Sequence, residues 1–83
     1  MNPFGADRWE EIAKSSNIKA IGTRGDWLIV KFRSNGAVYR YRGFASLYID
    51  LISAPSIGKM FHQAVLTSTK GERLLLEEWP DEG

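Results

Sequence analysis

The sequence predicts an α+β fold in which a three-stranded antiparallel β-meander is covered on one face by two C-terminal helices. Residues 27–33 and 37–42 alternate apolar and polar side chains, as strands with one buried face do. The dipeptide Asn35-Gly36 lies between them and is a strong β-hairpin signal. Residues 44–65 then carry apolar side chains at helical spacing. The 83 residues, of which 43% are hydrophobic, suit a single domain. That domain spans 1–83, with a core at about 15–66 and an acidic tail at about 72–83.

A short N-terminal helix is expected over residues 7–14. Trp9, Ile12 and Ala13 lie at positions i, i+3 and i+4, and the acids precede the lysine, in the order that the helix dipole favours. The tripeptide SSN then ends the helix. Residues 17–24 follow as the first strand, because β-branched residues lie there between turn signals.

The turn at the hairpin decides which side chains face the core. A two-residue Asn-Gly turn pairs Val30 with Tyr41 and Lys31 with Arg40, so that both tyrosines face the core. A three-residue turn would slip the register by one residue and move the tyrosines to the basic face. We expect the first arrangement, because burying apolar side chains costs far less than burying four cations. The predicted core positions of the hairpin are Leu28, Val30, Phe32, Tyr39 and Tyr41.

Two helices, over residues 45–54 and 56–66, are expected to cover the sheet, with Pro55 separating them. Ser56 is expected to cap the second helix, although the same turn, with Lys59 one turn later, also resembles a phosphate-binding turn. The segment after these helices is expected to contain a further strand or a short helix.

Charge is segregated along the chain, although the net charge is only +1. Residues 12–71 contain nine basic and two acidic residues, and the other acids lie near the two ends. On the predicted sheet, four bases and a tryptophan share the face away from the helices. Bases suit phosphate contacts, and the tryptophan suits stacking with an unpaired base. A solvated sheet face also needs charges, and this is the alternative interpretation. The candidate nucleic-acid contacts are Lys31, Arg33, Arg40, Arg42, Trp27 and Lys59.

The composition argues against several classes of function. The chain has no cysteine, which excludes disulfides and thiolate metal sites. His62 is the only histidine, and no catalytic constellation is evident, so we expect no enzyme activity, metal or cofactor. No leader pattern is present, and no run approaches the ~18 apolar residues of a membrane span, so we expect a cytoplasmic protein without membrane association.

Several spaced motifs resemble those of one family over about residues 15–62. In order they are S-S-N-I, I-G, L-x-V-x-F (Leu28, Val30, Phe32), a glycine-bearing turn, Y-x-Y (Tyr39, Tyr41) and A-P-S-x-G-K (54–59) followed by an aromatic residue. This pattern is similar to the KTSC domain, the family of lysyl-tRNA synthetase C-terminal domains, which also occurs as free-standing small proteins. The resemblance implies a small α+β fold and RNA binding.

We therefore expect a small non-catalytic module that binds nucleic acid, in particular RNA, through its basic sheet face. The alternative is a protein-interaction module that acts through its helices or its acidic tail, where Trp79 is a candidate anchor. The tail could also fold over the basic face and compete with RNA. An exposed edge at the first strand could pair two copies, so we expect a monomer or a weak homodimer.

Overall fold

The computed structural model describes residues 3–68 and 72–73. Its centre is one antiparallel sheet in which the strands follow one another in chain order, β1-β2-β3-β4-β5. A three-residue 3-10 turn, η1 (Pro3–Gly5), precedes the sheet. The strands are β1 (Arg8–Glu11), β2 (Ile18–Arg24), β3 (Trp27–Phe32), β4 (Val38–Arg42) and β5 (Glu72–Arg73).

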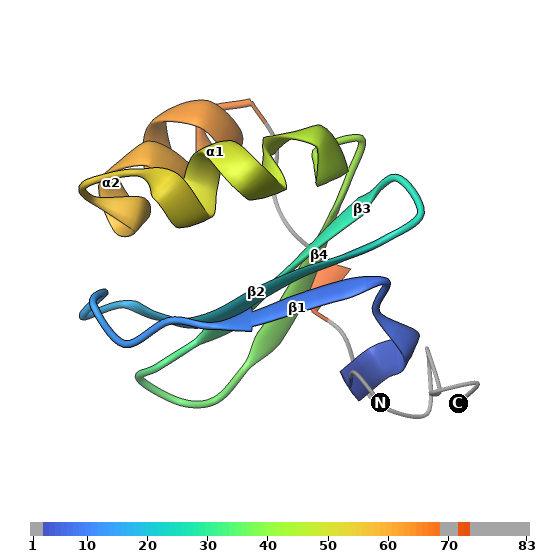
Figure 1. The fold of residues 1–83 in the computed structure, drawn as a ribbon, viewed down its shortest axis with the longest axis horizontal. Coiled ribbons are helices and arrows are strands. Elements are labelled where there is room, and N and C mark those ends of the chain that lie inside the picture. Colours follow the sequence, from blue (N-terminus) through green and yellow to red (C-terminus); the bar gives the residue numbers. More distant parts are fainter. Residues whose placement is uncertain (1–2, 69–71, 74–83) are drawn as a thin grey trace.

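A helical layer covers one face of the sheet (Figure 1). It consists of η2 (Ala45–Leu47), α1 (Tyr48–Ser53), α2 (Ile57–Phe61) and η3 (His62–Leu66), and η3 is a turn of π-helix that continues α2. The α+β class and the two predicted helical segments are confirmed. Ser56 occupies the N-cap position of α2, but its side chain makes no capping hydrogen bond, so the predicted side-chain cap is wrong.

The N-terminal helix predicted over residues 7–14 is wrong, because this segment forms β1 and pairs with β2. Trp9 lies opposite Gly22, and Glu11 lies opposite Ala20. A helix of two turns is marginal on its own, whereas β1 gains a ladder of hydrogen bonds with its neighbour. The prediction of a three-stranded meander is also wrong, since β1 and the two-residue β5 extend it at its two edges. Of the strand and the short helix expected after the helical layer, β5 is the strand.

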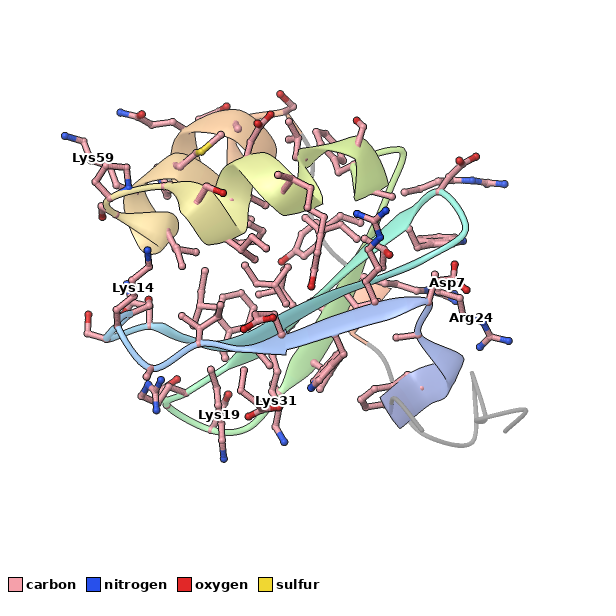
Figure 2. All side chains as sticks on the ribbon, viewed as in Figure 1. Asp7, Lys14, Lys19, Arg24, Lys31 and Lys59 are labelled. Atoms are coloured by element: carbon pink, nitrogen blue, oxygen red, sulfur yellow. The ribbon has the colours of Figure 1, made fainter. Side chains whose placement is uncertain are left out.

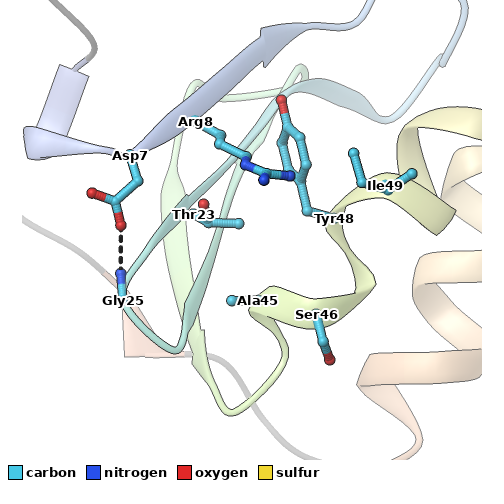
Figure 3. Close-up of a pocket in the computed structure, with 8 residues that line it drawn as sticks. All are labelled: Asp7, Arg8, Thr23, Gly25, Ala45, Ser46, Tyr48 and Ile49. Atoms are coloured by element: carbon cyan, nitrogen blue, oxygen red, sulfur yellow. Dashed lines mark hydrogen bonds between the residues drawn. The ribbon is translucent and has the colours of Figure 1, made fainter.

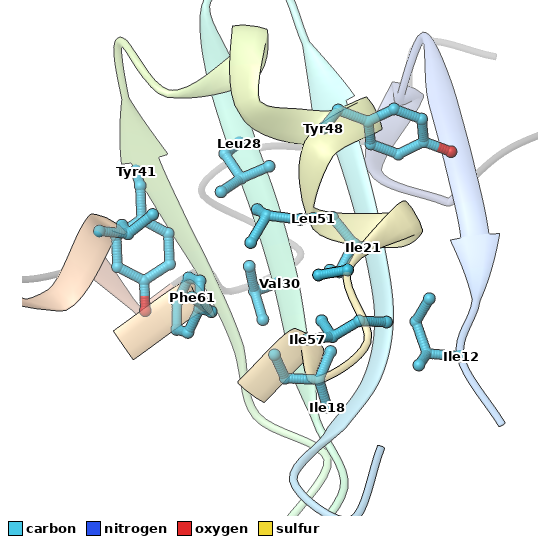
Figure 4. Close-up of a cluster of buried hydrophobic side chains, with 12 residues drawn as sticks. Ile12, Ile18, Ile21, Leu28, Val30, Tyr41, Tyr48, Leu51, Ile57 and Phe61 are labelled. Atoms are coloured by element: carbon cyan, nitrogen blue, oxygen red, sulfur yellow. The ribbon is translucent and has the colours of Figure 1, made fainter. Parts of the chain in front are cut away.

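The hydrophobic core lies between the sheet and the helical layer (Figure 4). Leu28 and Val30 of β3 are fully buried, and Tyr41 of β4 is 3% exposed. The ring of Tyr41 packs edge-on against Phe61 of α2, with the ring centroids 5.2 Å apart. The tyrosine-bearing face of the hairpin is therefore the core face. The other buried members of the cluster are Ile12, Ile18, Ile21, Tyr48, Leu51, Ala54, Ile57 and Val65, with Phe32 and Tyr39 packed against it.

The loop between β3 and β4 is longer than the predicted two-residue turn. The Phe32 N–H donates to the Ala37 carbonyl (2.9 Å), and the Gly36 N–H donates to the Phe32 carbonyl (3.0 Å), which closes a loop over residues 33–36. Gly36 adopts a φ of 70°, in the left-handed region that glycine tolerates best. The hairpin that Asn35-Gly36 predicts is therefore confirmed, and the two-residue turn is wrong.

The longer loop shifts the register of the hairpin by two residues. Val30 lies opposite Tyr39, Ile29 lies opposite Arg40, and Lys31 is not opposite an arginine. The expected cross-strand pairs, including Lys31 with Arg40, are therefore wrong. Because side chains alternate with a period of two, this shift leaves every side chain on its predicted face.

A second and smaller hydrophobic cluster lies on the outer face, by which we mean the face of the sheet away from the helices. Ile29 and Val38 are buried there under Phe4, Ala6 and Trp9. The rings of Phe4 and Trp9 lie 6.2 Å apart between centroids. The N-terminal segment thus covers part of the outer face, which the sequence patterns did not predict.

Candidate nucleic-acid interface

Trp27 and two arginines of β4 form a stacked group on the outer face. Trp27 is the cross-strand partner of Arg42, whose Cζ lies 5.5 Å from the centroid of the tryptophan ring system. Arg40 lies two residues away on the same face, with its Cζ 4.4 Å from that centroid. Both contacts are within the range of cation–π attraction. The observed register, and not the predicted one, places Arg42 directly opposite Trp27.

This stacking changes the role expected for Trp27. The indole is half-buried, and the Arg40 guanidinium lies over its ring. A guanidinium that stacks on an aromatic ring keeps its N–H donors in its own plane, where they can bind a phosphate through two oxygens. Trp27 therefore orients arginine side chains. The stacked Arg40 covers ring surface on which an unpaired base could otherwise stack.

Lysines extend the basic surface away from this stacked group. Lys31 of β3 and Lys19 of β2 point to the side of the sheet opposite the helices (Figure 2). We use the name outer basic strip for the set Lys19, Lys31, Arg40, Arg42 and Trp27. Lys19 was not among the predicted contacts; the β2–β3 register is irregular between Ile18 and Ala20, and simple alternation does not hold there.

Arg33, a predicted nucleic-acid contact, has a different environment. Its guanidinium donates hydrogen bonds to the carbonyls of Ile12 (2.5 Å), Ser15 (3.1 Å) and Ile18 (3.4 Å). Its backbone N–H donates to the Asn17 carbonyl (2.8 Å). Arg33 therefore fastens the β3–β4 loop to the segment between β1 and β2. The long side chain and the carbonyls it binds come from separate loops, so no local sequence pattern signals this contact.

Two other cations lie away from the outer basic strip. Lys59 is exposed on α2 in the helical layer, so the structure does not bring it together with Lys31 (Figure 2). Lys14 donates from Nζ to the Ala54 carbonyl at the end of α1 (3.1 Å). Arg24, in contrast, is the cross-strand partner of Trp27 and borders the strip, and its Nη1 donates to the Phe4 carbonyl (3.1 Å).

The segments that carry the S-S-N-I and A-P-S-x-G-K motifs meet at the end of the fold opposite the β2–β3 turn. A hollow of about 180 Å³ lies there, and Asn17, Phe32, Gly58 and His62 are among the residues that line it. A Cβ on Gly58 would lie 3.5 Å from Asn17 Nδ2, which is an ordinary contact distance. Close backbone approach is therefore not the reason for this glycine.

Within residues 3–68 and 72–73, no group of three or more histidine, aspartate or glutamate side chains is arranged to hold a metal ion. Among the helices of the same residues, none is long and apolar enough to cross a membrane.

Only the beginning of the predicted acidic tail lies within the described residues. β5 pairs with β4, and Glu72 is the partner of Arg40. The expectations for Trp79 and for a tail that folds over the basic face lie outside the described residues.

Comparison with protein families gives one result. A family model described as the KTSC domain matches residues 14–67, which is more than half of the chain. The matched region contains β2, β3, β4 and the helical layer, and it excludes β1. Searches of curated proteins and of solved structures gave no match.

Proposed function

The chain belongs to the KTSC domain family, and we propose that it is a small RNA-binding module that contacts phosphates through the outer basic strip. The observation that carries the proposal is the stack of Arg40 and Arg42 on Trp27. It holds two cations close together on one strand, where the outer face leaves Arg42 exposed.

The electrostatics of the strip favour a polyanion as the ligand. Arg40 and Arg42 lie two residues apart on the same face of β4, and Lys31 extends from the neighbouring strand. Like charges on neighbouring positions of a sheet repel one another, and a bound chain of phosphates removes that penalty. Stacking on Trp27 also restricts the arginine side chains before binding, so less conformational freedom is lost in the complex.

The same geometry predicts binding that tolerates many sequences. The strip supplies phosphate contacts, which position a nucleic acid and carry no direct sequence information. A flat sheet face with half-buried Trp27 also has no element of the kind that enters a duplex groove. Single-stranded RNA is therefore the expected ligand, and RNA is preferred to DNA because the resemblance to lysyl-tRNA synthetase C-terminal domains implies it.

Fluorescence anisotropy with a labelled ten-nucleotide oligouridylate tests the proposal. In single-stranded nucleic acid, each neutralised phosphate contributes roughly −0.7 to the slope of log affinity against log salt concentration. About three neutralised phosphates therefore predict a slope of about −2. Arg42→Gln and Lys31→Gln should each weaken binding several-fold and lower this slope. Lys59→Gln removes one positive charge from the helical layer and is the matched control, so its affinity should stay at the wild-type value. Equal losses in all three variants would point to net charge alone and contradict the proposed site.

A further inference from the structure

A groove runs along the open edge of the sheet between β1 and α1. One hollow, of about 370 Å³, is lined by Asp7 and Arg8 on the strand side and by Tyr48 and Ile49 on the helix side (Figure 3). It lies at the end of the sheet where β1 begins, beside the β2–β3 turn at Gly25.

A second hollow continues the groove toward the other end of β1. It has a volume of about 380 Å³ and is lined by Glu10, Glu11 and Ile12 on the strand side and by Ile52 on the helix side. Successive residues of the same strand and the same helix thus form the walls of both hollows. An extended chain laid along β1 would pass over both of them.

The backbone of β1 is suited to receive such a chain, because β1 is an edge strand of the sheet that residues 3–68 and 72–73 form. The Ile12 N–H donates to the Lys19 carbonyl (2.7 Å), so the main-chain groups of Ile12 face β2. Main-chain groups of successive residues in an antiparallel strand alternate between the two neighbours. Those of Trp9 and Glu11 therefore point to the open edge, and each residue offers one donor and one acceptor to an added strand.

The strand side of the groove is held in place before any partner arrives. The Asp7 N–H donates to the Thr23 carbonyl (2.7 Å), and the Asp7 carboxylate accepts from the Gly25 N–H (2.8 Å) (Figure 3). The Arg8 guanidinium lies over the ring of Tyr48, with Cζ 5.7 Å from the centroid. The two Asp7 bonds fix the start of β1 against β2 and the β2–β3 turn, and the Arg8 contact joins β1 to α1. A strand that is already held in place lowers the ordering cost of binding.

Charge and exposed apolar surface define the partner. Three of the five acids in residues 3–68, namely Asp7, Glu10 and Glu11, line the groove, together with the two bases Arg8 and Lys14. Arg8 lies over the Tyr48 ring and Lys14 donates to the Ala54 carbonyl, and the acids outnumber the bases. The helix side presents Ile49, which is 52% exposed and is one of the two large hydrophobic side chains exposed in the described residues. A basic residue next to an apolar one matches these walls, whereas a strongly acidic segment would be repelled.

We propose that the β1 edge binds an extended segment of a partner protein, which adds a sixth strand to the sheet. Side chains of this segment that point toward the helices alternate along the groove, as in other cases of strand addition. One of them is a lysine or arginine that meets Glu10, and another is an aliphatic side chain that packs on Ile49. This site lies at the sheet edge and does not depend on the outer basic strip or on RNA binding.

A selection from a library of random eight-residue peptides on the full chain tests the proposal. We expect enriched peptides with β-branched residues and at least one lysine or arginine. Titration of the ¹⁵N-labelled protein with the best peptide should shift the amides of Trp9, Glu11 and Ile49. Failure to enrich any peptide overturns the proposal, and so do shifts confined to the outer basic strip.

Two substitutions at one position separate strand addition from other binding. Glu11→Pro removes an N–H that points to the open edge, and edge strands tolerate proline at such positions. Glu11→Ala keeps that N–H and removes only the carboxylate that accepts from Trp9 Nε1 (2.7 Å). We expect at least a tenfold loss of peptide affinity in Glu11→Pro relative to Glu11→Ala. Equal affinities in the two variants would contradict strand addition.

Ile49→Arg supplies a test that leaves the strand unchanged. The side chain is exposed, so the variant should fold, and the new charge should weaken binding of a basic peptide at least fivefold. Unchanged affinity would overturn the assigned helix wall. Shifts of the Trp9 and Glu11 amides that grow with protein concentration in the absence of peptide would identify a second copy as the occupant, and would overturn the assignment to a separate partner.

Discussion

Trp9 of β1 lies against Gly22 of β2 so closely that any side chain at position 22 would force neighbouring atoms to move. A Cβ built on Gly22 would come within 2.6 Å of Trp9 Cε3 and within 2.5 Å of the Arg8 carbonyl oxygen. An aromatic side chain that covers a glycine on a neighbouring strand stabilises sheets at positions where the glycine itself packs poorly. This contact places Trp9 over the outer face, where it helps to bury Ile29.

Gly22→Ala should therefore destabilise the protein by about 1–3 kcal/mol, the usual cost of overpacking a filled site. The free energy of unfolding, measured with urea, checks this value. Gly58→Ala is the matched control, because a Cβ there would meet its nearest neighbour at an ordinary 3.5 Å. Since alanine is the better helix former, Gly58→Ala should raise stability by roughly 0.5 kcal/mol. A destabilised Gly58→Ala with an unaffected Gly22→Ala would contradict the assigned packing.

Arg33 is expected to matter for stability and not for RNA binding. Arg33→Lys cannot reproduce a planar fork that reaches three carbonyls, so it should lower the free energy of unfolding by about 1–2 kcal/mol. Its RNA affinity, measured under conditions where the protein is folded, should match that of the wild type. Arg42→Gln should show the opposite pattern, with lower affinity and nearly unchanged stability. If Arg33→Lys lost as much RNA affinity as Arg42→Gln, Arg33 would be an RNA contact and the structural role would be contradicted.

Tyr41 should make stability fall at high pH. Burial, with a smaller contribution from the charge of Tyr39, raises the pKa of the Tyr41 phenol to about 12. In the unfolded chain the phenol ionises near its ordinary pKa of about 10. The neutral phenol is thus favoured by folding, so its contribution is complete below pH 10 and is lost as the pH rises toward 12.

Urea unfolding at several pH values from 9 to about 11.5 measures this loss, together with phenolate absorbance. Tyr41→Phe keeps the ring that packs on Phe61 and removes the ionisable group, so its stability should depend less on pH over this range. Tyr48 is expected to ionise above its usual range too, because burial and then the charge of Glu10 raise its pKa against the opposing effect of Arg8. An identical pH dependence in Tyr41→Phe and the wild type would refute the role of Tyr41.

Side-chain periodicity predicts much of this fold, because it reports burial directly. The alternation in β3 and β4 identifies the core face correctly even though the register differs by two residues. The apolar spacing of residues 44–65 likewise predicts the helical layer. In both regions one face of the element is buried along its whole length, and the pattern is long enough to be distinctive.

The features that were not predicted depend on contacts between distant segments. Trp9, Ile12 and Ala13 fit a helix by spacing, but a four-residue strand is stabilised by β2 and by the room above Gly22. A glycine inside a predicted strand is a signal of close approach, and it was available at Gly22. The bonds of Arg33 and the stack of Arg40 on Trp27 require the loop path and the actual register, which alternation alone does not provide.

The most direct test of the central claim is an NMR titration of the ¹⁵N-labelled protein with the ten-nucleotide oligouridylate at two salt concentrations. If the outer basic strip is the RNA site, the amides of Lys31, Arg40 and Arg42 and the indole N–H of Trp27 should shift, and higher salt should reverse the shifts steeply. An absence of shifts at low salt, or shifts confined to residues of the groove between β1 and α1, would contradict RNA binding by this face.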